Sequence, residues 1–510
     1  MFKENRATKP EAIESAASTI SGNRGLMIEE KLIFELDDPG RIGVDLPKPV
    51  TPTKKLGKLA PRAKIGLPSL SEPEVVRHYT RLSQKNYGID TGFFPLGSCS
   101  MKHNPRLNEK MARLPGFGDI HPLQPQSTVQ GAFELIDMLA HWLKTLTGMP
   151  AVAMSPAAGA HGEACGMMAI RAALEAKGEK RNRVLVPEAA HGTNPATAAA
   201  CGFTVDSFPQ TNDGRVDMMA FKAKLGPDVA AIMLTNPNTC GLFERDIIEI
   251  AKLIHDAGGY FYCDGANYNA LIGRVKPGDL GIDCMHINLH KTCSTPHGGG
   301  GPGSGPVVFS KALAPYAPLP WIIHEGNNFN ALEVKEGPAQ NAFGRIKAFH
   351  GQMGMFVRAM AYCLSHGSDG LRQVAEDAVL NANYLLASLK DVLEAPYPGP
   401  CMHEAVFSDK TLTPHGISTM DLAKALIDEG YHPMTMYFPL VVQGAILIEP
   451  TETESKATLD QFINSVRGLI ERLKKDGPAY FKGAPYHTPR RRLDETQAAR
   501  QPVLRWKKPA

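Results

Sequence analysis

The stretch YFYCDGANYNALIGRVKPGDLGIDCMHINLHKT, residues 260–292, decides the fold class. It holds two short apolar runs, YFYC and CMHINL, separated by a segment rich in Gly and Pro. Runs of this length between Gly and Pro are typical of buried β-strands. The first run ends at Asp264 and the second leads to Lys291. Charged residues at the ends of buried strands predict a ligand site at the carboxyl edge of a sheet.

Similar apolar runs flank this stretch and alternate with helical stretches. They are RVLVPEAA (183–190), FTVDSFP (203–209), AAIMLTNP (230–237) and GPVVFS (305–310). Strands that alternate with helices predict the α/β class, with a mostly parallel sheet and right-handed crossovers.

The pattern along the chain predicts four parts. A Pro- and Lys-rich composition favours an extended arm at the start, and Ser71 with Glu74 is a possible capping box that opens the first helix. A long helical region from about 345 leads into a smaller mixed segment. The expected parts are an N-terminal arm (1–70), a large cofactor-binding domain with its leading helices (71–344), a small α+β C-terminal domain with a connecting helix (345–480) and a basic tail (481–510).

Composition excludes several classes of function. The 510 residues include 55 basic and 52 acidic ones and form no long basic stripe, so we expect no nucleic-acid partner. No apolar run reaches the roughly 18 residues of a membrane span. Nine scattered cysteines without a C-x-x-C pair favour reduced thiols in a cytoplasmic protein and give no metal site. The acids among the first residues argue against a targeting peptide.

Lys291 and Asp264 together point to one cofactor. A lysine that follows an apolar run is often only a solvated end, and an Asp in DGAN is as often a turn residue. A desolvated lysine amine, however, is a nucleophile toward an aldehyde. A buried carboxylate needs a cationic partner such as a protonated pyridine nitrogen. Pyridoxal 5′-phosphate (PLP) carries both groups, so the pair predicts PLP on Lys291.

A phosphate site is predicted where SPAAGAHGEACG opens a helix. The free N–H groups at a helix N-terminus bind phosphate without a basic side chain. Gly159, Ala160 and His161 are therefore the expected phosphate cup, and His290 beside the lysine can add a donor. The glycines Gly298 to Gly301 behind the lysine allow backbone to approach a ligand closely.

Four further residues complete the expected pocket. His191 follows a predicted strand and can stack on a planar cofactor, although a lone His is more often structural. Asn267 can donate to the phenolic oxygen of the cofactor ring. Asn236 and Thr239, in the turn TNPNTCG, are candidate pocket residues.

The order of phosphate turn, His, Asp and Lys resembles that of fold-type I PLP enzymes, the aspartate-aminotransferase-like group. This resemblance implies a large domain with a mostly parallel sheet and a smaller C-terminal domain. Longer motifs resemble the P-protein family of the glycine cleavage system, glycine dehydrogenase (decarboxylating). They are FFPLGSCSMKHNP (93–105), AGAHGE (158–163), AHGTNPATA (190–198), DGANYNA (264–270), NLHKT (288–292) and PHGGGGPGSGP (296–306).

The resemblance implies PLP-dependent decarboxylation of glycine, release of CO2 and transfer of the aminomethyl group to the lipoyl arm of the H-protein. The chain length resembles subunit 2 of the split form, which implies subunit 1 as a partner and an expected α2β2 assembly. Cys99, Lys102 and His103 are candidates to line the lipoyl channel. Two departures from the family pattern are Ser100, where Thr is expected, and Cys293, where Phe is expected.

Two rival functions remain open. One is another fold-type I activity, a desulfurase or a transaminase, and the other is a cofactor-binding regulator or scaffold. No Arg occurs between residues 373 and 466, where aminotransferases place the Arg that grips the substrate carboxylate. Because a bidentate Arg stabilises the charged carboxylate, its absence favours decarboxylation.

Overall fold

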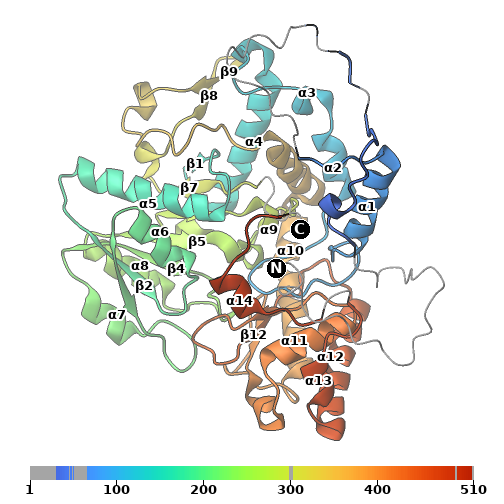
Figure 1. Cartoon of the computed structure of the whole chain (residues 1–510). Coiled ribbons are helices and arrows are strands. Elements are labelled where there is room, and N and C mark those ends of the chain that lie inside the picture. The colour runs from blue at the N-terminus through green and yellow to red at the C-terminus, as the bar shows by residue number, and fades with distance from the viewer. Residues whose placement is uncertain are drawn as a thin grey trace. The chain divides into compact units, whose positions relative to one another are not determined.

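The structure is a computed structural model that describes residues 30–44, 46–48, 50, 66–297, 303–488 and 491–507 (Figure 1). The chain forms two compact units. The smaller takes in the described residues of Met1–Thr91, Lys424–Tyr431 and Ala479–Ala510, and the larger comprises Gly92–Ala423 and His432–Pro478.

A seven-stranded sheet is the centre of the larger unit, in the order β1-β7-β6-β5-β4-β2-β3. All pairs from β3 to β6 are parallel, and β7 is antiparallel to both of its neighbours. The predicted mostly parallel sheet is therefore confirmed. Its strands are β1 Ala151–Ala153, β2 Arg183–Pro187, β3 Thr204–Phe208, β4 Val229–Thr235, β5 Tyr260–Asp264, β6 Cys284–His286 and β7 Val307–Phe309.

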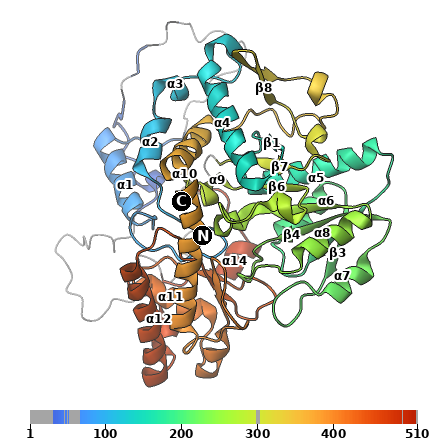
Figure 2. The ribbon, with the colours of Figure 1, turned by 180° about the vertical axis from the view of Figure 1, so that it is seen from behind.

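Helices cover both faces of this sheet, as Figures 1 and 2 show. Alternate residues of a strand point to opposite faces, so Ile232 packs in one apolar cluster and Met233 in another. The Ile232 cluster includes residues of α4 Gln130–Thr147, α7 Met218–Lys224, α8 Ile247–Asp256 and α10 Met353–Leu389. The Met233 cluster includes residues of α5 Gly159–Ala176 and α6 Thr193–Ala200.

Lys291 lies beyond a strand rather than at its end, which corrects the expectation from the sequence. Strand β6 ends at His286, and Lys291 belongs to a one-turn helix, α9 Leu289–Thr292. The N–H of Ile287 bonds the Pro306 carbonyl and that of Leu289 bonds the Ser304 carbonyl, in the register in which β6 pairs β7, before the chain enters α9. The apolar run therefore continues past the strand because Ile287 and Leu289 are core residues of the turn as well.

The C-terminal part of the larger unit contains a three-stranded antiparallel sheet, in the order β10-β12-β11. Its strands are β10 Ala405–Phe407, β11 Thr435–Met436 and β12 Ile446–Ile448. The helical region expected from about residue 345 is α10, which contains a kink at Gly367, and α12 Lys456–Asp476 follows it in this unit. Helix α11 Thr419–Asp428 begins in this unit, and its residues from Lys424 belong to the smaller one. A hairpin of β8 Trp321–Glu325 and β9 Asn328–Leu332 precedes them.

The smaller unit contains the predicted capped helix, α1 Glu72–Gln84. The Ser71 N–H and hydroxyl both donate to Glu74 Oε2, at 2.9 and 2.7 Å, which confirms the capping box. Two short helices near the end of the chain, α13 Ala479–Gly483 and α14 Glu495–Arg500, also belong to this unit.

The remaining helical elements are short. They are α2 Arg106–Ala112 and α3 Pro115–Gly118, and the 3-10 turns η2 Ile33–Glu35, η4 Gln126–Thr128, η5 Gly265–Ala270, η6 Pro277–Leu280, η7 Ala314–Tyr316, η8 Gly337–Ala339, η9 Asp409–Thr411 and η10 Thr413–His415. Among the helices that the structure describes, none has the length and apolar character to cross a membrane. The predicted domain limits at residues 70, 344 and 480 stay predictions.

Candidate active site

Lys291 projects from α9 toward the loop that precedes α2. Its Nζ donates a hydrogen bond of 2.7 Å to the Ser98 carbonyl, and the side chain is half-buried. The segment from Gly298 to Gly301, which the sequence places behind the lysine, lies outside the described residues. The amine therefore sits at the margin of the protein interior.

Asp264 ends β5 and is buried. Its carboxylate accepts hydrogen bonds from Asn194 Nδ2 at 3.0 Å and from the Ala266 N–H at 2.9 Å, and His286 Nε2 lies 3.4 Å away. Burial acts to raise the pKa of Asp264, but His286, Asn194 and Ala266 outweigh it and hold the pKa below its usual range. Asp264 is therefore an ionised carboxylate, suited to a protonated ring nitrogen.

Glu163, on α5, was not identified as a site residue from the sequence. Asn194 Nδ2 bridges the two acids, because it also donates to Glu163 Oε2 at 2.8 Å. Burial, and then the charge of Asp264, raise the pKa of Glu163 to about 8. At neutral pH one of the two acids thus holds a proton and the other is charged. Only its place in the motif AGAHGE signalled Glu163, since a Glu in a helix ordinarily faces solvent.

The expected phosphate cup lies at the start of α5. The first-turn N–H groups of a helix have no partner within the helix, and no side chain caps this end. A Cβ on Gly159 would lie 2.4 Å from Asn288 Nδ2, so only glycine lets α5 begin this close to the turn that precedes Lys291. The ring of His161 is turned back to the chain, where its Nδ1 accepts from the Ala157 N–H at 2.9 Å. The backbone of Gly159, Ala160 and His161 is thus available to an anion.

His290 lies beside Lys291 and is neutral. Burial, and then the neighbouring His297, Lys291 and His286, together lower the pKa of its ring to about 3. Its ring meets that of His297 edge to face, with centroids 4.6 Å apart. His290 can offer a hydrogen bond to a phosphate, but it brings no positive charge.

His191 lies on the loop between β2 and α6 and is exposed. Its Nδ1 is 2.7 Å from the Thr193 hydroxyl, which fixes the ring, and the edge of Phe438 packs at 5.5 Å between centroids. An exposed ring fixed in this way is suited to stacking on a flat ligand.

Three of the expected pocket residues are buried: Asn236 and Thr239, in the turn after β4, and Asn267, in η5. Asn267 Nδ2 donates to the Pro237 carbonyl at 2.8 Å, and the Thr239 hydroxyl donates to the Ala189 carbonyl. Both side chains therefore hold the turn in place, and Asn267 commits one of its amide hydrogens to that contact. Asn236 Oδ1 accepts from the Glu244 N–H at 2.9 Å, while its Nδ2 stays free within the described chain.

The three candidate channel residues have different surroundings. Cys99 is half-buried near Lys291; burial raises the pKa of its thiol, and the lysine opposes this. His103 is exposed, and its N–H donates to Thr453 Oγ1 at 3.2 Å. Lys102 was expected to line the lipoyl channel, but its ammonium is buried and hydrogen-bonded to other residues of the chain. It bonds Glu452 at 2.7 Å, Asn269 at 2.9 Å, and Thr292 and Tyr362 at 3.1 Å.

Unpaired buried polar atoms test whether this site fits PLP. In the part of the chain that the structure describes, Asn194 Oδ1, Thr235 Oγ1, Asn236 Nδ2 and His297 Nε2 make no hydrogen bond. Buried polar atoms ordinarily have partners. Together with the uncapped α5 and the charged Asp264, these atoms fit a polar ligand with an anionic end and a cationic ring.

Comparison with known proteins decides the family. A protein of Caulobacter vibrioides named "Probable glycine dehydrogenase (decarboxylating) subunit 2" is 67% identical over 99% of this chain and 98% of its own. The protein of the same name from Desulforamulus reducens is 51% identical, over 94% of this chain and 99% of its own. The chain belongs to the glycine dehydrogenase (decarboxylating) subunit 2 family.

Sequence models of two families match parts of this subunit 2 chain. Residues 374–478 match the glycine dehydrogenase C-terminal domain, and residues 160–301 match class-V aminotransferases. Among solved structures, glycine decarboxylase (P-protein) of the glycine cleavage system, in inhibitor-bound form, has a TM-score of 0.68 at 23% identity, covering 82% of this chain and 93% of that one. A NifS-like protein has a TM-score of 0.56 at 13% identity, with coverages of 74% and 99%. The predicted fold class is thus confirmed.

The two departures from the family pattern lie close to the site. The Ser100 N–H donates to Glu449 at 2.9 Å and its hydroxyl donates to the same carboxylate, which a Thr hydroxyl could do as well. Cys293 is buried and contacts the Cys363 thiol. Nothing in the structure explains why Cys rather than Phe occupies position 293.

Proposed function

We propose that this subunit decarboxylates glycine with PLP held by Lys291. The observation that carries the proposal is the convergence of a half-buried amine, an ionised buried carboxylate and an uncapped helix end in one unit of the chain. PLP, when bound, supplies an electron sink for the bond electrons that the leaving carboxylate gives up.

The residues of this chain have separate tasks. Lys291 would hold the cofactor aldehyde, and the start of α5 at Gly159, Ala160 and His161 would bind its phosphate. Asp264 would keep a proton on the ring nitrogen, and its low pKa suits that task. His191 would cover one ring face. Asn194 supports this arrangement, because it holds Asp264 and Glu163 in place.

Glycine is proposed as the substrate and the lipoyl arm of the H-protein as the acceptor of the aminomethyl group. The support is membership of the family, whose members are named for decarboxylating glycine dehydrogenation. Subunit 1 is the proposed partner in an α2β2 assembly, and the cytoplasm is the proposed location. The lack of Arg between residues 373 and 466 supports decarboxylation, since no such side chain there stabilises the carboxylate that must leave.

Neither Cys363 nor Cys401 supports a desulfurase function. Such an enzyme needs a cysteine on a mobile exposed loop, whereas Cys363 lies within α10 and is fully buried, and Cys401 is 8% exposed. A buried thiol with a raised pKa, as in both residues, is a poor nucleophile.

The test combines purified chain, PLP, subunit 1 and lipoylated H-protein with carboxyl-labelled glycine. We expect labelled CO2 to be released and Lys291→Ala to abolish the release. Lys252→Ala, on the exposed face of α8, is the matched control and should release label at the normal rate. Absence of label release from the wild-type assembly would refute the proposed reaction.

A further inference from the structure

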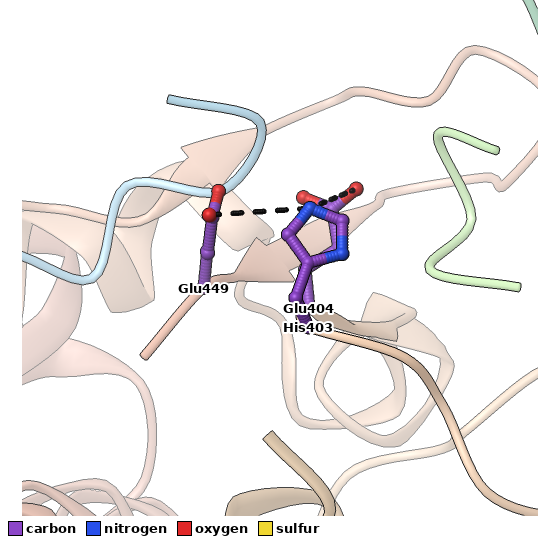
Figure 3. A group of neighbouring side chains, drawn as sticks. All are labelled: His403, Glu404 and Glu449. Atoms are coloured by element: carbon purple, nitrogen blue, oxygen red, sulfur yellow. Dashed lines mark ion pairs between the residues drawn. The ribbon is translucent and has the colours of Figure 1, made fainter. Parts of the chain in front are cut away.

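A second group of ionisable side chains lies in the larger unit, and none of its members is among the residues assigned above to the cofactor. His403 and Glu404 directly precede β10, and Glu449 directly follows β12, which pairs with β10. All three side chains are at most 1% exposed. Figure 3 shows Glu449 beside the ring of His403, with Glu404 next to that ring. Because β10 and β12 run antiparallel, the start of one meets the end of the other and brings these acids together.

The group has unfilled hydrogen-bonding capacity. His403 Nε2 lies 3.9 Å from Glu449 Oε1 and 4.0 Å from Glu404 Oε1, too far for direct hydrogen bonds. Within the described chain, neither ring nitrogen of His403 has a partner, and Glu404 Oε1 has none. Leaving several polar atoms unpaired in the interior is costly, so the arrangement calls for a functional explanation.

The distances between the donor atoms of the three residues favour a site that holds a proton over one that binds a metal ion. Donor atoms of the three residues lie within 4.8 Å of one another. With bonds of about 2.1 Å, separations near 4 Å would open the angle at a metal to about 140°, far from the tetrahedral angle of structural zinc sites. A ligating His also normally donates its second ring nitrogen to a partner, and that of His403 has none in the described chain.

One short loop joins this group to Lys291. The Ser98 N–H donates to Glu404 Oε2 at 2.7 Å, and the carbonyl of the same residue accepts from Lys291 Nζ at 2.7 Å. Ser100 holds Glu449 through its N–H and its hydroxyl. Ser98 and Ser100 have φ of 65° and 43°, in the left-handed region that serine seldom adopts. Strain of this kind concentrates at functional sites, and here it points the loop at both the acids and the lysine.

Hydrogen bonding decides which acid carries the proton. Two buried carboxylates this close cannot both be charged. Glu449 accepts two hydrogen bonds from Ser100, whereas Glu404 accepts one from Ser98 and keeps Oε1 without a partner in the described chain. Burial, and then Glu449, accordingly raise the pKa of Glu404 well above its usual value. The ionisable groups that act on the two acids are His403, Lys291, His297, Cys99, Cys240 and Cys401.

We propose that His403, Glu404 and Glu449 form the proton donor of this active site, with the proton on Glu404. The inference rests on the proposed function and concerns its second step, the transfer of the aminomethyl group to the lipoyl arm. When the lipoyl disulfide takes up the aminomethyl group, a C–S bond forms and the S–S bond breaks. The departing sulfur keeps the electron pair of that bond and receives the Glu404 proton. The acid regains a proton from the ammonium group of the next glycine, which must lose one to react, so protons balance over the cycle.

The first test needs neither cofactor nor activity. Infrared spectra of the cofactor-free chain at neutral pH should contain the carbonyl band of a protonated carboxylic acid, and Glu404→Gln should remove the component due to that acid. Glu249→Gln, an exposed acid of α8, is the control and should leave the spectrum unchanged. Glu449→Gln should retain the Glu404 band and move its pH midpoint down, because the neighbouring charge is gone. A spectrum that Glu404→Gln does not alter would overturn the proposal.

The second test uses the full assembly and separates the two proposals. If the wild-type assembly releases labelled CO2, the proposed function holds. Glu404→Gln should then slow formation of aminomethyl H-protein by roughly 100- to 10,000-fold and remove the fall in rate at high pH that a required acid produces. Glu404→Asp should restore part of the rate. A Glu404→Gln assembly with the wild-type rate and pH profile would sink the proton-donor role while leaving the decarboxylase proposal intact.

Discussion

The ammonium of Lys291 lies 2.7 Å from the Ser98 carbonyl, although 193 positions separate the two residues in the sequence. This contact joins the lysine turn behind β6 to the loop that also holds Glu404 and Glu449. The proposed cofactor lysine and the buried acids therefore share one support, and a change in the loop is expected to affect both.

Gly159→Ala should weaken PLP binding. The added Cβ would lie 2.4 Å from Asn288 Nδ2, so α5 must shift away from the lysine turn. Overpacking of this kind costs about 1–3 kcal/mol, which corresponds to a loss of affinity for PLP of roughly 5- to 150-fold. Titration of the cofactor-free chain with PLP measures it. Gly131→Ala, at an open position of α4, is the matched control. Equal affinity for both variants would argue against a phosphate site at this helix end.

Glu163→Gln should change how stability depends on pH. The folded chain raises the pKa of Glu163 to about 8, through burial first and then Asp264. Between the ordinary glutamate pKa and that value only the folded form keeps the proton, so rising pH favours unfolding. In the wild-type chain this effect lowers the unfolding free energy by about 2 kcal/mol between pH 6 and 8, and the variant should lack that decrease. Denaturant titration at the two pH values measures it.

The control for this pH effect is Glu175→Gln, an exposed acid near the end of the same helix. It should retain the wild-type dependence. If Glu163→Gln and Glu175→Gln give the same slope, then Glu163 is charged at neutral pH and the assignment of the proton to it is wrong.

Lys102→Met should destabilise the chain. The buried ammonium neutralises Glu452 and has four acceptor atoms within 3.1 Å of its nitrogen, so its loss leaves an uncompensated carboxylate. Removing one partner of a buried ion pair lowers the free energy of unfolding by about 3–5 kcal/mol. Adding Glu452→Gln should recover part of this loss.

An exposed ion pair supplies the comparison. Lys456→Met breaks the pair of Lys456 with Asp460 on the surface of α12 and should leave the unfolding midpoint nearly unchanged. If Lys102→Met is equally harmless to folding but raises KM for the H-protein, the channel role first expected for Lys102 is correct after all.

Local pattern was enough to predict most of the sheet. The strands β2 to β7 all lie within apolar runs that the sequence displays, and all of them except the edge strand β3 are mostly buried. Strand β1 was not predicted. It spans only Ala151–Ala153, and three small residues carry too little periodicity to distinguish a strand from a turn.

Candidate site residues could be predicted from local pattern where they lie near a strand end or at a helix start. Asp264 and His191 were singled out in this way and stay predictions, whereas Glu163 lies within a helix and looks like a surface residue in the sequence. Glu404 and Glu449 were not predicted from the sequence, for another reason. Their partner is the loop at Ser98 and Ser100, more than 300 residues earlier, and no local pattern reveals a contact over that separation.

The attachment of PLP to Lys291 is the central claim, and borohydride reduction followed by peptide mass mapping tests it most directly. Reduction fixes the cofactor to the amine that holds it. We predict a pyridoxyl-phosphate adduct on Lys291 and an unmodified Lys102, whose ammonium is committed to Glu452. An adduct on any other lysine, or none after incubation of the folded chain with PLP, would contradict the account.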